Sequence, residues 1–230
     1  MMKRRASKII RVGGLKIGGA RPIVVQSMTK TDTRDVKSTV HQIRQLEECG
    51  CEIVRVAVPD MDAARAIVDI KKRIKIPLIA DIHFDYRLAL EALKSGADGL
   101  RLNPGNISDP EHITKVVRAA KVREIPIRVG VNVGSLPKSS KKRASAVERM
   151  VDAALEEIKL LESLDFDLIK VSLKAFEVPA TIEAYEAIAL KIPYPLHLGI
   201  TEAGLPWAGS IRSAVGLGIL LYGGIGDTIR

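Results

Sequence analysis

Basic residues recur at matching places in short apolar stretches, and side chains of this type could bind an anion together. Four stretches, 52–55, 98–101, 167–170 and 227–230, open with an acid and end on a base. Four others, 22–26, 77–81, 126–130 and 195–199, open with proline. The two kinds strictly alternate along the chain, so the bases belong to a repeated unit.

The bases of these stretches share one face if the stretches are strands, because side chains two residues apart on a strand point the same way. They are Arg55, Arg101, Arg128, Lys174 and Arg230, with Lys170 as a further candidate. Asp81 and Glu202 are the obvious counter-charges. Desolvating like charges together is unfavourable unless an anion neutralises them, and arginine forms paired hydrogen bonds to phosphate oxygens. We therefore predict a site for a small phosphate or diphosphate. The alternative for each base alone is a solvated, outward side chain.

Metal chemistry gains less support. His83 and His197 could be ligands, but single histidines on strands are more often hydrogen-bonded polar residues, and no Cys/His cluster has zinc spacing. Cys49 and Cys51 are predicted to be small buried residues at the end of the molecule away from the anion site.

Two glycine-containing stretches, 103–106 and 132–135, could present backbone N–H groups to an anion. Neither is a P-loop, and no dinucleotide-binding glycine motif follows a strand. The sequence therefore gives no support for ATP or NAD as a cofactor.

Helical patterns fill most of the gaps between the stretches. The spacing of apolar residues predicts helices over 36–49, 61–74, 86–94, 110–122, 146–164, 181–189 and 210–221. Asp32 or Asp35 could cap the first of these, and Gly50 could end it. Strands that alternate with helices and are apolar on both faces indicate a parallel sheet covered by helices. Eight units with two alternating strand types predict a (βα)₈ TIM-type barrel; an open, doubly wound sheet is the alternative.

The eighth strand is predicted to be incomplete, because its stretch ends at Arg230. We expect residues 1–20 to be an N-terminal extension and 21–230 to be an incomplete barrel. Such a barrel would have unpaired strand edges, and the isolated chain is predicted to aggregate.

Composition limits the class of protein. The chain has 230 residues, 47% of them hydrophobic, and a formal net charge of +9. No run of about 18 apolar residues exists to span a membrane. The 3 Phe, 1 Trp and 4 Tyr residues do not interleave with basic runs, so nucleic-acid binding is a weak hypothesis. The two cysteines are too few for a disulfide scaffold, which favours a cytoplasmic protein.

Nine motifs in the chain resemble those of the 4-hydroxy-3-methylbut-2-enyl diphosphate synthase family. They are 26–29, 31–35, 53–57, 80–85, 101–106, 128–132, 171–175, 195–204 and 224–230. They are dense, collinear and run from about Arg21 to the end of the chain.

The resemblance implies an oxidoreductase of the non-mevalonate route to isoprenoids. Enzymes of that family reductively open the ring of 2-C-methyl-D-erythritol 2,4-cyclodiphosphate and remove water. The resemblance also implies a later domain that holds a [4Fe-4S] cluster on three cysteines and a glutamate. Those ligands are not in this chain, and Cys49 and Cys51 do not match them. It further implies a homodimer, with flavodoxin or ferredoxin as the electron donor.

Carried over residue by residue, the resemblance assigns roles to the site residues. Diphosphate-binding positions match Arg55, Arg101, Arg128, Lys174 and Arg230, and polar pocket positions match Asn103 and Asn132. Glu202 matches a glutamate that assists proton transfer, and no metal ligand matches. The alternatives are a dihydropteroate-synthase-like transferase, which would use Asp81 and Asn103, and a binding module that has ligand affinity but no catalysis.

Overall fold

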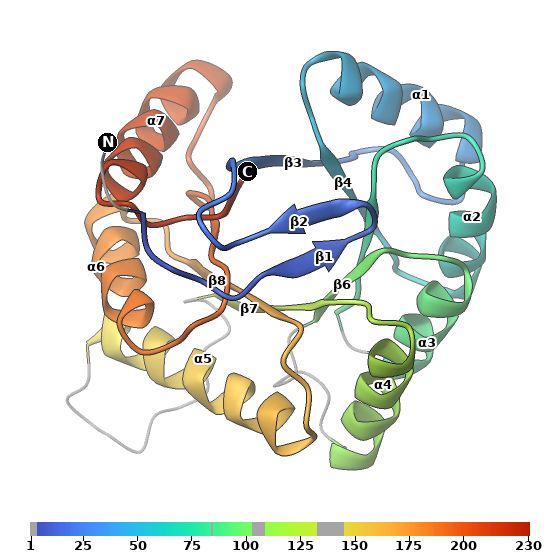
Figure 1. Cartoon of the computed structure of the whole chain (residues 1–230). Helices are drawn as coiled ribbons and strands as arrows, with labels where there is room; N and C mark the ends of the chain where they lie inside the picture. The colour runs from blue at the N-terminus through green and yellow to red at the C-terminus, as the bar shows by residue number, and fades with distance from the viewer. Residues whose placement is uncertain (1–3, 84, 103–108, 133–144) are drawn as a thin grey trace.

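The computed structural model describes residues 4–83, 85–102, 109–132 and 145–230 and shows an eight-stranded parallel barrel (Figure 1). The barrel strands are β3 (Val24–Met28), β4 (Ile53–Ala57), β5 (Leu78–Asp81), β6 (Gly99–Leu102), β7 (Ile127–Asn132), β8 (Ile169–Lys174), β9 (His197–Leu198) and β10 (Thr228–Ile229). The helices around it are α1 (Val36–Glu48), α2 (Met61–Lys71), α3 (Tyr86–Lys94), α4 (Pro110–Val122), α5 (Ala146–Ser163), α6 (Val178–Ala189) and α7 (Pro206–Tyr222).

The sheet closes on itself. Its strand order is β8-β7-β6-β5-β4-β3-β10-β9, and a parallel bridge between Val171 and Leu196 brings the β9 segment back to β8. The predicted TIM-type barrel is therefore confirmed, and the open-sheet alternative is wrong. The expected open edge at the eighth strand is also wrong, because Thr228 and Ile229 of β10 pair with β3 and with β9.

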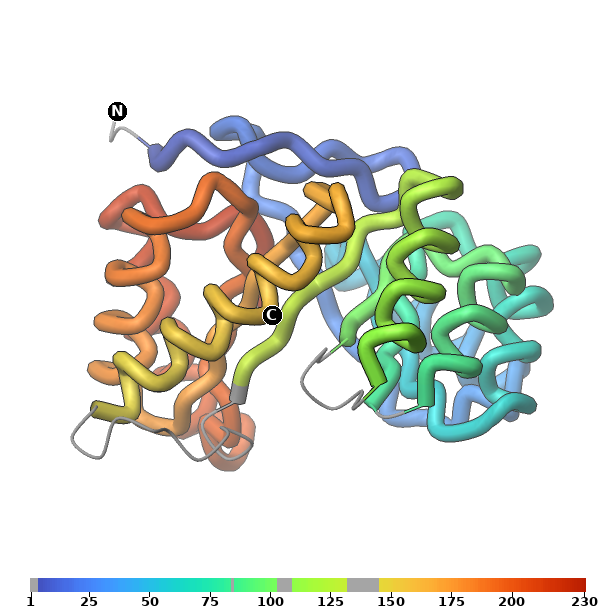
Figure 2. The backbone as a smooth tube through the Cα atoms, turned by 90° about the horizontal axis from the view of Figure 1, so that it is seen from below, coloured from blue at the N-terminus to red at the C-terminus, as the bar shows by residue number. Residues whose placement is uncertain are grey.

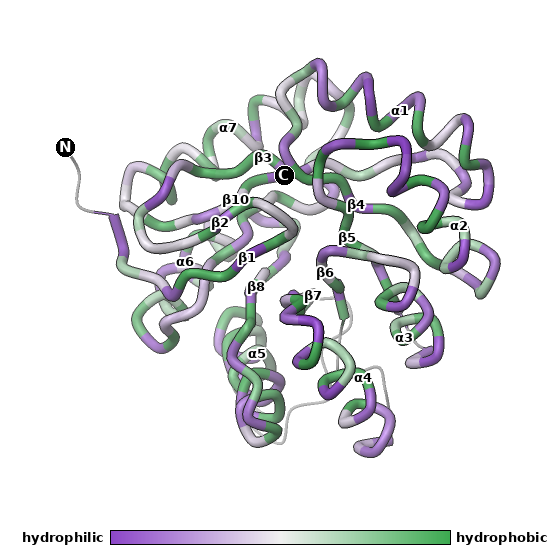
Figure 3. Tube along the Cα trace, turned by 45° about the vertical axis from the view of Figure 1, so that its right-hand side comes forward, coloured by the Kyte–Doolittle hydropathy of each residue, from purple (hydrophilic) through white to green (hydrophobic). Residues whose placement is uncertain are grey.

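Helix starts follow from side-chain caps at the positions that the sequence pattern indicates. Asp35, Asp60, Asp85 and Asp109 each accept a hydrogen bond from a backbone N–H in the first turn of the helix that follows. The chain leaves α1 through Gly50, whose φ of +87° favours glycine. Hydrophilic and hydrophobic residues alternate along α1 and α2, whereas the central strands are mainly hydrophobic (Figure 3).

The N-terminal segment is folded onto the barrel. Strands β1 (Ile10–Val12) and β2 (Leu15–Ile17) form an antiparallel hairpin that lies across one end of the barrel (Figure 2). The hairpin buries Ile10, Val12 and Ile17 against Val24, Ile53 and Ile79. These six residues form an apolar floor at the N-terminal ends of the strands.

Residues just before the hairpin tie the last two strands to that floor. The guanidinium of Arg5 donates to the carbonyl oxygens of Ala189, Ile192 and Tyr194. The Asp227 carboxylate accepts from Ser7 Oγ at 2.9 Å and from the backbone N–H of Leu196 at 2.8 Å. Segment 4–8 therefore acts as a strap across the point where the barrel closes.

No helix in the described part of the chain combines the length and the apolar character needed to cross a lipid bilayer.

Candidate functional site

Three arginines from strands of the same side of the sheet are buried inside the barrel. Arg55 on β4, Arg101 on β6 and Arg128 on β7 have exposed fractions of 4%, 5% and 1%. Two of them share one buried carboxylate, that of Asp81 on β5. Arg55 Nε lies 3.4 Å from Asp81 Oδ2, and Arg101 Nη1 lies 3.4 Å from Asp81 Oδ1. Each is an ion-pair distance, and neither Arg101 Nη1 nor Asp81 Oδ1 has a hydrogen-bond partner among the described residues.

The lumen is where these side chains meet. Lys170 Nζ on β8 lies 3.5 Å from Gln26 Oε1 on β3, and these strands are not neighbours in the sheet. The contact must therefore cross the interior of the barrel. Arg55 Nη2 donates to the sulfur of Met28 at 3.0 Å, and Arg230 Nη1 lies 3.6 Å from the same sulfur.

We call the charged residues of this group the lumen cluster: Arg55, Asp81, Arg101, Arg128, Lys170, Lys174 and Arg230. The cluster thus holds six basic side chains and one carboxylate. Five hydrogen-bonding nitrogens of its arginines are buried without a partner among the described residues, namely Nε and Nη1 of Arg101 and Nε, Nη1 and Nη2 of Arg128. Buried donors of this kind are unfavourable to leave unpaired, so acceptor oxygens placed among these nitrogens would be stabilising.

Burial and mutual repulsion depress the pKa values of the cations. The pKa of Lys174 falls to about 6, chiefly through burial and then through Arg128 and Arg55. Burial and the same two arginines lower the pKa of Lys170 to about 7. The pKa of Arg55 falls to about 10, because burial outweighs the attraction of Asp81, and burial lowers the pKa of Arg128 well below its ordinary value. A bound anion would reverse this repulsion.

A hydrogen-bonded polar layer lies among these cations. His197 Nδ1 and Thr228 Oγ1 are 2.7 Å apart, and both residues are buried. Burial and the nearby Arg128 hold the pKa of His197 well below its ordinary value. The sequence favours His197 as a hydrogen-bonded polar residue, and Thr228 is its partner in the structure. His83 Nε2 lies 3.8 Å from Asp81 Oδ2, and no group of three or more potential metal ligands occurs within the described ranges.

The other predicted site residues that the structure describes lie at strand ends or in a turn. Arg230 follows β10 and is exposed to solvent, although partial burial and the nearby Arg101 lower its pKa. Glu202 is exposed in the turn after β9, with a φ of +52°, and is not part of the buried lumen cluster. Asn132 is the last residue of β7 and pairs in register with Lys174. Asn103 lies outside the described residues.

Two lumen contacts were not assigned from the sequence. Met28 and Thr228 are uncharged, so a pattern of bases does not include them, although the two-residue alternation places Met28 on the same face as Gln26. Lys170 was only a further candidate, yet it is as buried as the arginines, at 2% exposed.

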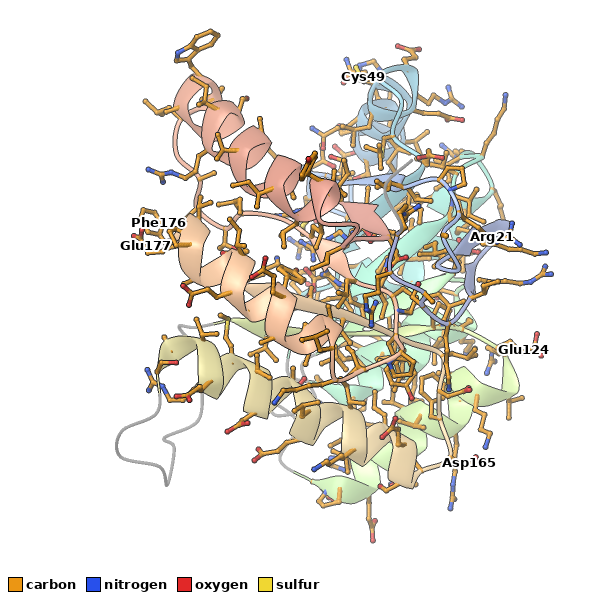
Figure 4. All side chains as sticks on the ribbon, turned by 60° about the vertical axis from the view of Figure 1, so that its left-hand side comes forward. Arg21, Cys49, Glu124, Asp165, Phe176 and Glu177 are labelled. Carbon is orange, nitrogen blue, oxygen red and sulfur yellow. The ribbon has the colours of Figure 1, made fainter. Side chains whose placement is uncertain are left out.

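The cysteines do not form a cluster site. Cys51 is buried, and burial raises the pKa of its thiol. Cys49 is exposed at the outer end of α1 (Figure 4), so the prediction that both cysteines are buried is wrong for Cys49. It is the C-cap of α1, where the helix ends toward solvent. Because the chain has 2 cysteines, it does not contain the three that the resemblance implies for a [4Fe-4S] cluster.

Comparison with known protein families gives a match over nearly the whole chain. The model of the GcpE TIM-barrel domain matches residues 7–230. A protein of Dehalococcoides mccartyi named 4-hydroxy-3-methylbut-2-en-1-yl diphosphate synthase (flavodoxin) is 64% identical over 230 residues, which cover 100% of this chain and 66% of the relative. A protein of the same name from Thermodesulfovibrio yellowstonii is 59% identical and is also covered to 66%. The chain therefore spans slightly less than two thirds of these relatives.

Comparison with solved structures gives similar folds at low sequence identity. Dihydropteroate synthase of Yersinia pestis superposes with a TM-score of 0.73 at 12% identity, covering 96% of this chain and 90% of that one. The Xanthomonas albilineans enzyme in complex with 7,8-dihydropteroate gives a TM-score of 0.70 at 16% identity, covering 96% and 91%. At such identities the likeness concerns the fold alone.

Proposed function

The chain belongs to the GcpE TIM-barrel domain family, and on that premise we propose that its lumen cluster binds 2-C-methyl-D-erythritol 2,4-cyclodiphosphate. The chain would then be the substrate-binding barrel for the reductive ring opening and dehydration of this compound to 4-hydroxy-3-methylbut-2-enyl diphosphate, a step of isoprenoid biosynthesis. In this proposal Arg55, Arg101, Arg128, Lys174 and Arg230 bind the diphosphate, and Asn103 and Asn132 contact the rest of the substrate.

The observation that carries the proposal is the excess of buried cations over anions in the lumen. Three arginines and Lys170 are each at most 5% exposed, and Asp81 is the one carboxylate of the cluster. A neutral ligand would leave this repulsion in place. A diphosphate brings several negative charges and many acceptor oxygens, which matches both the charge and the unpaired arginine nitrogens.

Glu202 would take part in proton transfer rather than in binding. It lies in an exposed turn beyond β9, outside the cation cluster, so this role requires the bound substrate to extend to that turn. Glu202→Gln in the longer protein tests this role, since it should lower turnover and leave binding of the cyclic diphosphate unchanged.

The reduction itself would need parts that this chain does not hold. It has two cysteines, one exposed and one buried. The [4Fe-4S] cluster that the resemblance implies needs three cysteines and a glutamate. We propose that a further domain of the longer protein supplies the iron–sulfur cluster, that flavodoxin donates electrons as the relatives' name states, and that the full protein is a cytoplasmic homodimer. The chain alone would bind substrate without turning it over.

A transferase resembling dihydropteroate synthase is the second candidate. The similar fold favours it, but identity of 12–17% with the structures of that enzyme contrasts with 64% for the reductase relatives. Binding of a pterin diphosphate in preference to the cyclic diphosphate would support this candidate instead.

Calorimetric titration of the chain with the cyclic diphosphate tests the proposal. Arg101→Ala and Lys174→Ala should each weaken binding by about tenfold or more, because each removes a charge-assisted contact. The affinity should also fall as salt rises. Arg123→Ala and Lys191→Ala, at exposed positions outside the barrel, are the matched controls. Unchanged affinity in both lumen variants would rule out the lumen as the site.

A further inference from the structure

One lumen position in the middle of the cluster carries no side chain. Gly130 lies on β7 two residues after Arg128, is buried, and pairs in register with Ser172 of β8. A Cβ atom added to Gly130 would lie 3.2 Å from Arg101 Nε and 3.5 Å from Arg101 Nη2. The guanidinium of Arg101 therefore lies tightly against the space that a side chain at this position would take.

The closest contact is with the inner part of the guanidinium. Because Nε is the nitrogen joined to the side-chain stem, relieving the crowding requires the whole plane to move, not only its outer end. The opposite side of Arg101 is also restricted, since its Nη1 lies 3.4 Å from Asp81 Oδ1. The guanidinium is thus held between the bare backbone of β7 and the carboxylate on β5.

We propose that Gly130 is a positioning residue for anion binding, which fixes the direction of Arg101 by having no side chain. The inference rests on the proposed function, because it assumes that Arg101 binds the diphosphate. An alanine would displace the guanidinium by a few tenths of an ångström from acceptor oxygens whose hydrogen bonds depend on distance and angle. Backbone conformation is not the reason for this glycine, because Gly130 lies in a regular strand and is not among the residues with positive φ.

The test is a double-mutant cycle between Gly130→Ala and Arg101→Ala, read by calorimetric binding of 2-C-methyl-D-erythritol 2,4-cyclodiphosphate. Gly130→Ala should weaken binding about tenfold in the wild-type background, as loss of one hydrogen bond to a charged group would. In the Arg101→Ala background the same change should alter affinity by less than about twofold, because nothing is left to displace. Equal effects in both backgrounds, or no effect in either, would overturn the inference.

A matched control lies on the neighbouring strand. Gly99→Ala on β6 makes an equally close contact, 3.2 Å, but with Cγ1 of Ile79 in the apolar floor. It should lower the thermal midpoint and leave the affinity unchanged. Ser172→Ala in the Gly130→Ala background removes the other close atom, the Ser172 oxygen at 3.3 Å. Affinity restored by that change would assign the effect to Ser172 and refute the role of Arg101.

Two further outcomes separate this inference from the proposed function. If the wild-type chain does not bind the cyclic diphosphate, the proposed function fails and the inference fails with it; if wild type binds and Gly130→Ala binds equally well, only the inference fails. Should Gly130→Ala not fold, folding restored by adding Arg101→Ala would support the displacement, and continued failure to fold would contradict it.

Discussion

Arg128 is the single residue at which the proposed binding and the stability of the free chain conflict most directly. Its side chain is 1% exposed, and all three guanidinium nitrogens are without a hydrogen-bond partner among the described residues. Removing a cation from water without pairing it is strongly unfavourable. Such a group persists in a protein when a ligand uses it, because selection for function tolerates locally destabilising residues.

Arg128→Met should therefore stabilise the free chain while it abolishes binding. Methionine fills a similar volume without a charge, so we expect a gain of about 1–3 kcal/mol in the free energy of unfolding, or a rise of roughly 2–12 °C in the thermal midpoint. Differential scanning calorimetry and titration with the cyclic diphosphate measure the two effects. A destabilised variant would mean that Arg128 is satisfied in the free protein.

Lys174 provides a pH signature of anion binding. With a pKa lowered to about 6 by burial and by Arg128, its amine is mostly neutral at pH 8 in the free chain. A bound anion stabilises the ammonium form and raises this pKa, so Lys174 itself should take up about one proton when the anion binds at pH 8. Below about pH 5 the amine is already protonated and this uptake should vanish.

Calorimetry in two buffers of different ionisation enthalpy measures that uptake. Affinity should fall as the pH rises from 6 toward 9, because each binding event must then protonate a largely neutral amine. Lys174→Met should lower the uptake by about one proton, and the remainder belongs to Lys170, whose pKa of about 7 leaves it mostly neutral at pH 8 as well. Uptake that is unchanged in Lys174→Met would contradict the assignment.

At the scale of elements, the strap formed by segment 4–8 compensates for two very short strands. β9 and β10 have two residues each, so few ladder hydrogen bonds hold them. Arg5→Met removes donations to three carbonyl oxygens beside these strands. We expect a loss of about 2 kcal/mol in urea unfolding. Arg11→Met, in an exposed position of the hairpin that follows the strap, is the control and should change stability by less than about 0.5 kcal/mol.

Most elements could be predicted from local patterns, whereas the strap could not. α3 and α4 begin and end at the predicted residues, because aspartate caps and apolar spacing are local signals. α6 begins at Val178 and not at 181, since proline at its second position starts the helix a turn earlier. The hairpin and strap depend on contacts with residues near 190 and 227, which no local pattern encodes.

The residues of the candidate site were predictable only within strands, where side chains alternate between the two faces. Strand periodicity places Arg55, Arg101 and Arg128 on one face, and closure of the barrel then makes that face the lumen. Glu202 follows β9 in a turn, where the two-residue period no longer holds, so its exposed position could not be inferred from register. The shared use of Asp81 by two arginines likewise depends on the observed packing.

At the scale of the whole molecule, one face of the barrel is unusually apolar. The exposed side of α7 carries Trp207, Ile211, Val215, Ile219 and Tyr222 at helical spacing, with Trp207 81% and Tyr222 74% exposed. Arg212 is the only charged residue of the helix. The sequence predicts aggregation of the isolated chain from unpaired strand edges, but β10 is paired with both β3 and β9. Contiguous apolar surface of this kind is a separate reason to expect association.

Charges placed on this face should keep the isolated chain monomeric. Ile211→Glu with Ile219→Lys adds opposite charges two turns apart without touching the lumen cluster, so binding of the cyclic diphosphate should be retained. Light scattering across a concentration series should show association in the wild type and a monomer in the double variant. Leu190→Glu, a single exposed apolar site 91% accessible at the end of α6, should associate as the wild type does. If it were the variant that became monomeric, α7 would not be the face responsible.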